Sequence, residues 1–286
     1  MTAQFSVRDC VGAALRFVRE NLRFVATVAG VGALGTGVIA AAAAAVPQIG
    51  LLTSIASTVL QAFVYAALTA AMLFGAAAVR GRLVGDGGRV WLAMAIIGVL
   101  MGIVIFVVSI PVVITLIAGP LGPYAGELQT AGSDQAAVMT VMLRFMQENP
   151  VAVLLVTLFF FAVWFLLTSR LYLAAPASVD QKRVMTFETW SWTKGNMLRI
   201  VGARLMLLVP AYLLTFALSY LIGYGFGIDP TNAAAIAAVA MANPVAFLVY
   251  ATASAFVTFV LYNALEAGLS AAIYRALKPA STPPAA

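Results

Sequence analysis

The side chains that could carry chemistry are few and widely separated. The chain has no histidine, a single cysteine (Cys10) and ten acidic residues, and no two acids lie three or four residues apart within an apolar run. Membrane enzymes that act on phospholipids or polyprenyl phosphates need clustered carboxylates for a metal, or a nucleophile beside a base. The GDGG at 85–88 has no following Lys-Ser/Thr and is interpreted as a turn. We therefore expect no enzyme activity, no metal site and no cofactor.

One acid is placed where it could lie at membrane depth. Glu266 follows Pro244 by 22 residues, which is about 33 Å of helix and puts it at the boundary of a membrane-spanning run. Arg204 is its natural partner, with Arg170 and Arg199 as other basic residues at the same level. We expect Arg204 and Glu266 to form a structural ion pair inside the membrane, and the alternative is a polar binding cleft.

A charged segment that carries tryptophan interrupts the apolar runs, with the sequence RLYLAAPASVDQKRVMTFETWSWTKGN at 170–196. A proline in this segment is expected to end or bend the preceding helix. Indole rings and basic side chains suit the membrane interface. The functional interpretation is contact with lipid head groups or a partner helix, and the structural alternative is an anchor that sets helix depth. The candidate contact surface comprises Arg170, Pro176, Trp190, Trp192, Lys194 and Asn196.

The amino-acid composition indicates that the charged and aromatic residues described above belong to a membrane-embedded protein. The chain is 63% hydrophobic and 9% charged, with a mean hydropathy of +1.03, whereas a soluble domain carries about 25% charged residues. Six apolar runs reach the length of about 20 residues that crosses the hydrocarbon. We expect an all-α polytopic membrane protein whose six transmembrane helices occupy approximately 24–46, 50–78, 90–118, 150–175, 198–227 and 244–272.

Basic residues are concentrated on one side of this six-span arrangement. Fifteen of the 16 Lys and Arg fall on the side of the termini, and Arg144 alone falls opposite. This bias predicts that both termini are cytoplasmic. Because the basic residues stand at the ends of apolar runs, the net charge of +6 does not indicate nucleic acid. The expected partners are anionic head groups at the cytoplasmic face and another membrane protein.

The chain also repeats itself. NPVA begins both the fourth and the sixth run, at 149–152 and 243–246, and Pro111 and Pro210 occupy matching places in the third and fifth. The intervening loops contain helix-like QAAVMTVMLRFMQ and NAAAIAAVAMA. Spans three–four and five–six are interpreted as two copies of one hairpin, with spans one–two as a more diverged third. The prolines are expected to kink the bundle, or alternatively to act as hinges of a gate.

Residues 1–23 are predicted to form an amphipathic helix at the cytoplasmic interface. Its apolar positions recur at helical spacing while arginines occupy the other face; the stripe comprises Val7, Val11, Ala14, Val18 and Leu22. Ser6 can cap its start. The small residues Ala29, Ala33 and Gly37 are expected to pack against another helix of the same chain. The membrane domain is assigned to 24–278, with a cytoplasmic interfacial segment at 176–197, and a disordered tail to 279–286.

The segment also resembles a known group of bacterial proteins. Arg170-Leu-x-Leu-x-x-Pro176 followed by Thr189-Trp-Ser-Trp-Thr-Lys-Gly-Asn196 is similar to the signature of YciC-like inner-membrane proteins and of the membrane domain of some glycerophosphodiester phosphodiesterases. In that group the second part commonly reads Ser-Trp-x-Leu-Thr-Arg-Gly-Asn, so Thr189 and Trp192 depart from it. The resemblance implies an all-helical bacterial inner-membrane domain. It implies no phosphodiesterase activity, and it carries over no functional residues.

These observations favour a non-catalytic inner-membrane protein that organises lipids or partner proteins. The alternative is a transporter or channel for a lipid or other apolar substrate, suggested by the repeated hairpins with matched prolines. A third possibility is a membrane subunit that works with a soluble enzyme. Few polar residues lie in mid-span, which argues against a path for ions or sugars.

Overall fold

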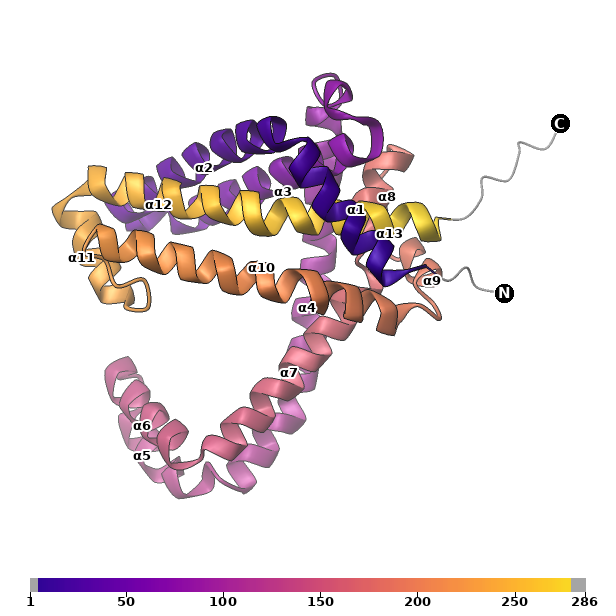
Figure 1. The fold of residues 1–286 in the computed structure, drawn as a ribbon. Coiled ribbons are helices and arrows are strands. Elements are labelled where there is room, and N and C mark those ends of the chain that lie inside the picture. Colours follow the sequence, from indigo (N-terminus) through magenta and orange to yellow (C-terminus); the bar gives the residue numbers. More distant parts are fainter. Residues whose placement is uncertain (1–4, 279–286) are drawn as a thin grey trace. The chain divides into compact units, whose positions relative to one another are not determined.

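The computed structural model describes residues 5–278, and over this range the chain is all-helical (Figure 1). Six helical stretches are long and apolar enough to cross a membrane, as the sequence predicts for a multi-pass membrane protein. The long helices are α2 (Leu22–Ala45), α3 (Gly50–Phe74), α4 (Leu83–Ala118), α7 (Pro150–Arg170), α10 (Met197–Gly225) and α12 (Pro244–Thr258), the last continued by the π-helix η4 (Phe259–Asn263) and by α13 (Ala264–Leu277). The predicted tail at 279–286 lies outside the described residues.

Shorter helices connect the spans. They are α1 (Val7–Glu20), α5 (Ala125–Ala131), α6 (Gln135–Glu148), α8 (Ala174–Gln181), α9 (Glu188–Trp192) and α11 (Ala233–Ala242), with 3₁₀ turns η1 (Pro47–Ile49), η2 (Ala76–Ala78) and η3 (Gly122–Tyr124). The alanine-rich loop stretches are helical, as expected, in α6 and α11. Both Asn-Pro dipeptides serve the same local purpose, because Pro150 and Pro244 are the first residues of α7 and α12, where a missing N–H has no cost.

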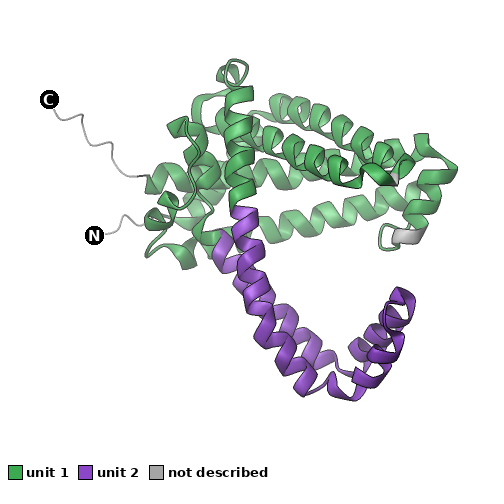
Figure 2. Cartoon of the chain, turned by 180° about the vertical axis from the view of Figure 1, so that it is seen from behind, with its two compact units in different colours: residues 1–96, 169–286 green, residues 97–168 purple. Residues whose placement is uncertain are grey.

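The chain divides into two compact units, which were not predicted from the sequence (Figure 2). Unit 1 contains residues 1–96 and 169–286, and unit 2 contains residues 97–168. One boundary falls inside α4 and the other just before the end of α7. Unit 2 has a small core in which Tyr124 and Phe145 meet edge to face at 5.7 Å between ring centroids. The Tyr124 hydroxyl donates a hydrogen bond to Glu148, and this hydrogen bond raises the pKa of the Tyr124 phenol.

In unit 1, α2 packs against both α3 and α12, and α12 packs against α10. The predicted stripe of small residues lies in these contacts: Ala29 and Ala33 are fully buried. A Cβ on Gly37 would stand 2.1 Å from Thr252 Oγ1 and 3.2 Å from the Leu248 carbonyl oxygen. Small side chains therefore let α2 and α12 approach closely, and the expectation of packing within one chain is confirmed.

α1 packs on α13 and α10, and its buried residues are Cys10, Val11, Ala14 and Phe17. The Ser6 hydroxyl caps the helix as expected, accepting from the Asp9 N–H at 3.3 Å. The predicted stripe is wrong at its far end, because Leu22 is 55% exposed and belongs to α2. The chain leaves the helical path at Asn21 (φ −113°, ψ 25°), so the period does not continue across it.

Two local predictions are corrected. The GDGG at 85–88 is helical, since α4 begins at Leu83 and Asp86 accepts hydrogen bonds from Arg82 Nε and Arg89 Nη1, both at 3.0 Å. These ion pairs on one helical face stabilise the first turns despite the glycines. The chain turns earlier, at Gly75 with φ +89°, a conformation that glycine adopts without strain.

Pro176 neither ends nor bends the helix that precedes it. α7 already ends at Arg170, and Pro176 lies in the first turn of α8, where no intrahelical N–H is needed. The last span is also interrupted, by the π-helix η4. No proline or glycine in FVLYN signals this interruption.

Candidate functional site

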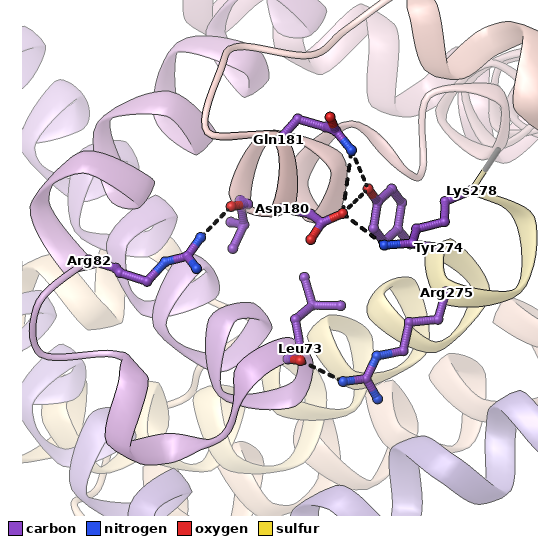
Figure 3. Close-up of polar contacts among 8 residues, drawn as sticks. Leu73, Arg82, Asp180, Gln181, Tyr274, Arg275 and Lys278 are labelled. Carbon is purple, nitrogen blue, oxygen red and sulfur yellow. Dashed lines mark hydrogen bonds and ion pairs between the residues drawn. The ribbon is translucent and has the colours of Figure 1, made fainter. Parts of the chain in front are cut away.

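Helices α1, α8, α9 and α13 lie together at one end of unit 1, opposite α11 (Figure 1). We call this the basic end, and it includes the link from η2 into α4. Its centre is Asp180, at the end of α8. Tyr274 Oη donates to Asp180 Oδ2 at 2.6 Å, and Lys278 Nζ lies 3.2 Å from the same oxygen (Figure 3). Gln181 Nε2 donates to Tyr274 Oη at 3.3 Å. This network joins α8 to α13 across more than 90 residues of sequence.

Two arginines extend the junction to the neighbouring helices (Figure 3). Arg82 Nη2 donates to the Val179 carbonyl oxygen at 2.6 Å, which ties the start of α4 to α8. Arg275 Nη2 donates to the carbonyl oxygens of Leu73 and Met72 at 2.7 and 2.8 Å. These are terminal carbonyls of α3, which a cation satisfies and stabilises. The polar groups at this centre are thus engaged in holding helices together.

Around the junction, a second set of basic residues is exposed. The ion pairs closer than 4.0 Å among residues 5–278 involve other cations, so this second set is exposed and outside those ion pairs. The exposed set comprises Arg8, Arg16, Arg19, Arg23, Arg80, Lys182 and Lys194.

The predicted contact surface separates into exposed and buried members. Trp190 is 38% exposed, and the Arg170 guanidinium lies over its ring at 5.4 Å. Lys194 is exposed. Trp192 is half-buried beside Tyr274, with ring centroids 6.1 Å apart. The residues that can meet lipid or a partner are therefore mainly Trp190 and Lys194.

The remaining two residues of the predicted contact surface are buried and contribute to packing. Pro176 is buried within α8, and Asn196 is 1% exposed at the start of α10. Two exposed apolar residues near them were not included in the predicted contact surface, namely Phe187, which is 50% exposed, and Leu198, which is 75% exposed. Their position beside the tryptophans could have identified them, since the same interface suits any large apolar side chain.

The predicted intramembrane pair lies within unit 1. Arg204 is 4% exposed, its Nη1 donates to Ser169 Oγ at 2.7 Å, and its guanidinium lies 4.8 Å from the Tyr172 ring centroid. Glu266 is half-buried and close enough to interact electrostatically with Arg204. The Tyr172 hydroxyl donates to the Glu266 carbonyl oxygen at 3.4 Å. Ser169, at the end of α7, and Tyr172, just after it, are the direct contacts of Arg204. These contacts could not be predicted from the sequence.

The two candidate hinges, Pro111 and Pro210, lie inside α4 and α10, and each helix continues on both sides of its proline. Pro111 borders a cavity of about 290 Å³ in unit 2 with Val156 and Phe159 of α7. Thr115 Oγ1 donates to the Pro111 carbonyl oxygen at 2.8 Å. Both prolines are exposed, so a hinge function for them stays a prediction.

Among the residues that the structure describes, no group of three His, Cys, Asp or Glu side chains is close enough to hold a metal ion. The lone thiol, Cys10, lies on the buried face of α1. Burial, together with the neighbouring Asp9 carboxylate, raises the pKa of this thiol to about 11. Cys10 therefore stays protonated at neutral pH, which does not suit a nucleophile.

Searches against protein-family models, curated proteins and solved structures find no match. The resemblance of residues 170–196 to YciC-like proteins accordingly stays a prediction.

Proposed function

We propose that this is a non-catalytic, multi-pass protein of the bacterial inner membrane that binds anionic lipid head groups at its basic end and thereby organises lipid around itself. The observation that carries the proposal is the exposed basic set. Asp86, Asp180 and Glu188 pair with other cations at this end. The exposed Asp9 and Glu20 are outnumbered by the four arginines of residues 8–23, so the exposed set keeps a net positive charge that can attract phosphate.

The order of the spans supports a cytoplasmic orientation of the basic end. With both termini on one side, that side carries 15 basic and six acidic residues, a net charge of +9. The other side carries one basic and four acidic residues, a net charge of −3, and together they give the chain's +6. Basic connections favour the cytoplasmic face, whose leaflet is negatively charged.

Two further elements complete the proposed interface. The arginines of α1 lie on the face opposite the buried Ala14 and Phe17, which suits a helix lying at head-group level. The Trp190 ring and the neighbouring Phe187 are exposed next to Lys194. Aromatic rings beside cations are typical anchors of the membrane interface.

The test is the preference for phosphatidylglycerol over phosphatidylcholine, measured as the lipids retained by the protein after release from mixed nanodiscs. A quadruple variant replaces Arg16, Arg19, Lys182 and Lys194 with Gln. Each basic residue near the surface is worth about 1 kcal/mol, or about fivefold, so the variant is expected to lose at least tenfold in preference. The matched control, Arg144→Gln, removes the one basic residue assigned to the other side and is expected to change nothing. An unchanged preference in the quadruple variant would refute the proposal.

The alternative of a transporter for an apolar substrate makes a different prediction. If Pro111 and Pro210 were hinges, replacing both with Ala would change lipid flux in proteoliposomes. For a lipid-organising protein, the double variant is expected to leave flux and head-group preference unchanged, because it only restores two backbone hydrogen bonds within helices. A change in flux at unchanged stability would favour transport.

A further inference from the structure

An apolar groove crosses the surface of unit 1 between α2 and α12, with one contribution from α10. Its volume is about 530 Å³, which lies in the range of small-molecule sites. Gly30, Ala33 and Leu34 line it from α2, and the residues facing them include Ala253 and Phe256 of α12. Thr252 is the only lining residue with a polar side chain. A lining with a single hydroxyl group cannot satisfy the hydrogen bonds or charge of a sugar or an ion, whereas it suits a hydrocarbon chain.

The groove is aligned with a cation on the same helix. Arg23, Thr27, Gly30 and Leu34 are spaced by four, three and four residues, so they lie along one face of α2. Arg23 is exposed at the start of the helix, and Leu34 is 60% exposed. Thr27 presents no free hydroxyl on this face, because its Oγ1 donates to the Arg23 carbonyl oxygen at 2.8 Å.

The depth of the groove also fits an acyl chain. At 1.5 Å per residue, Gly30 and Leu34 lie about 10 and 16 Å along the helix from Arg23. The hydrocarbon core is about 30 Å thick, so one leaflet is about 15 Å deep. A phospholipid whose phosphate meets Arg23 therefore has its acyl chain at the level of the groove.

We propose that this groove binds one acyl chain of an anionic phospholipid whose phosphodiester lies beside Arg23. The inference rests on the proposed function and adds a specific site to it. The basic set would attract anionic lipid in general, whereas the groove holds one molecule through its chain.

Gly30 allows a clean test, because a Cβ added there has no neighbour within 4 Å. Because Gly30 lines the groove, Gly30→Leu adds its side chain there from a Cβ that meets no protein atom, and Ala253→Leu fills the groove from α12. The control, Gly102→Leu, adds the same side chain to α4 at another position with no neighbour within 4 Å. The readout is native mass spectrometry of protein released from nanodiscs of phosphatidylglycerol and phosphatidylcholine, which counts the lipids that remain bound.

We expect the unmodified protein and Gly102→Leu to keep one phosphatidylglycerol through delipidation. Both filling variants are expected to lose at least tenfold in its occupancy, and Arg23→Gln to lose about fivefold. Retention of the lipid by both filling variants, or a retained molecule that is not a lipid, would overturn the inference. If those variants keep the lipid while the quadruple basic variant loses it, the groove inference fails and the proposed function stands. If the unmodified protein shows no preference for phosphatidylglycerol, both fail.

Discussion

The packing of α1 on α13 depends on a glycine, and this dependence can be measured. A Cβ added to Gly268 would lie 3.2 Å from Ala14 Cα and 3.3 Å from Ala14 Cβ, and Ala14 is fully buried. Because the nearest atom is backbone, the larger side chain of Gly268→Leu must push α1 away. Overpacking of this kind costs about 1–3 kcal/mol, which raises the population of undocked α1 by about 5- to 150-fold.

Cys10 reports this undocking, because it is buried in the same interface. We expect maleimide to label Cys10 in Gly268→Leu about 5- to 150-fold faster than in the unmodified protein, with Gly268→Ala in between. The control, Gly202→Leu, adds the same side chain to α10 where nothing lies within 4 Å, and it should label at the unmodified rate. Size-exclusion profiles in detergent establish that each variant is folded. A folded Gly268→Leu that labels at the unmodified rate would refute the role of this contact.

Three further outcomes follow from the basic end. Asp86→Ala should lower the free energy of unfolding by about 2 kcal/mol. This is less than the roughly 3–5 kcal/mol lost when a fully buried ion pair is broken, because the arginine partners of Asp86 keep some solvent contact. Thermal melting in detergent measures the loss, and a loss no larger than that of the exposed Glu127→Ala would contradict the prediction. Asp180→Asn should cost about 1–3 kcal/mol through weaker hydrogen bonds to Tyr274 and its neighbours, and an unchanged melting temperature would show that the junction does not stabilise the fold. The pKa of Cys10, about 11, predicts that its labelling rate rises about tenfold per pH unit between about pH 8 and 10, whereas a plateau in that range would show an ordinary thiol.

The sequence predicted the number and order of the spanning helices because apolar runs of this length have no other stable environment. It also predicted the close packing of Ala29, Ala33 and Gly37, since small residues at four-residue spacing have a direct geometric meaning. Helix ends were less predictable. The glycines at 85–88 predict a turn, but the segment is helical in the structure. The hydrogen bonds from Arg82 and Arg89 to Asp86 compensate for the low helix propensity of these glycines.

The site was predictable only where a side chain carries its own signal. Trp190 and Lys194 were assigned to the contact surface from residue type alone, and both are exposed. The hydrogen bond between Asp180 and Tyr274 could not, because it joins residues 94 positions apart through tertiary packing. The groove beside Gly30 was equally hidden, since an apolar lining is indistinguishable in sequence from an apolar helix face.

The central proposal, that the exposed basic set binds anionic head groups, is tested most directly by the salt dependence of lipid preference. The measurement is the ratio of phosphatidylglycerol to phosphatidylcholine associated with the unmodified protein, taken as ionic strength rises from about 0.01 to 1 M, over which the screening length falls from about 30 to 3 Å. We predict a clear preference for phosphatidylglycerol at low salt that declines steadily toward a ratio of about one at 1 M. A ratio near one at low salt, or a preference that does not change across the titration, would contradict it.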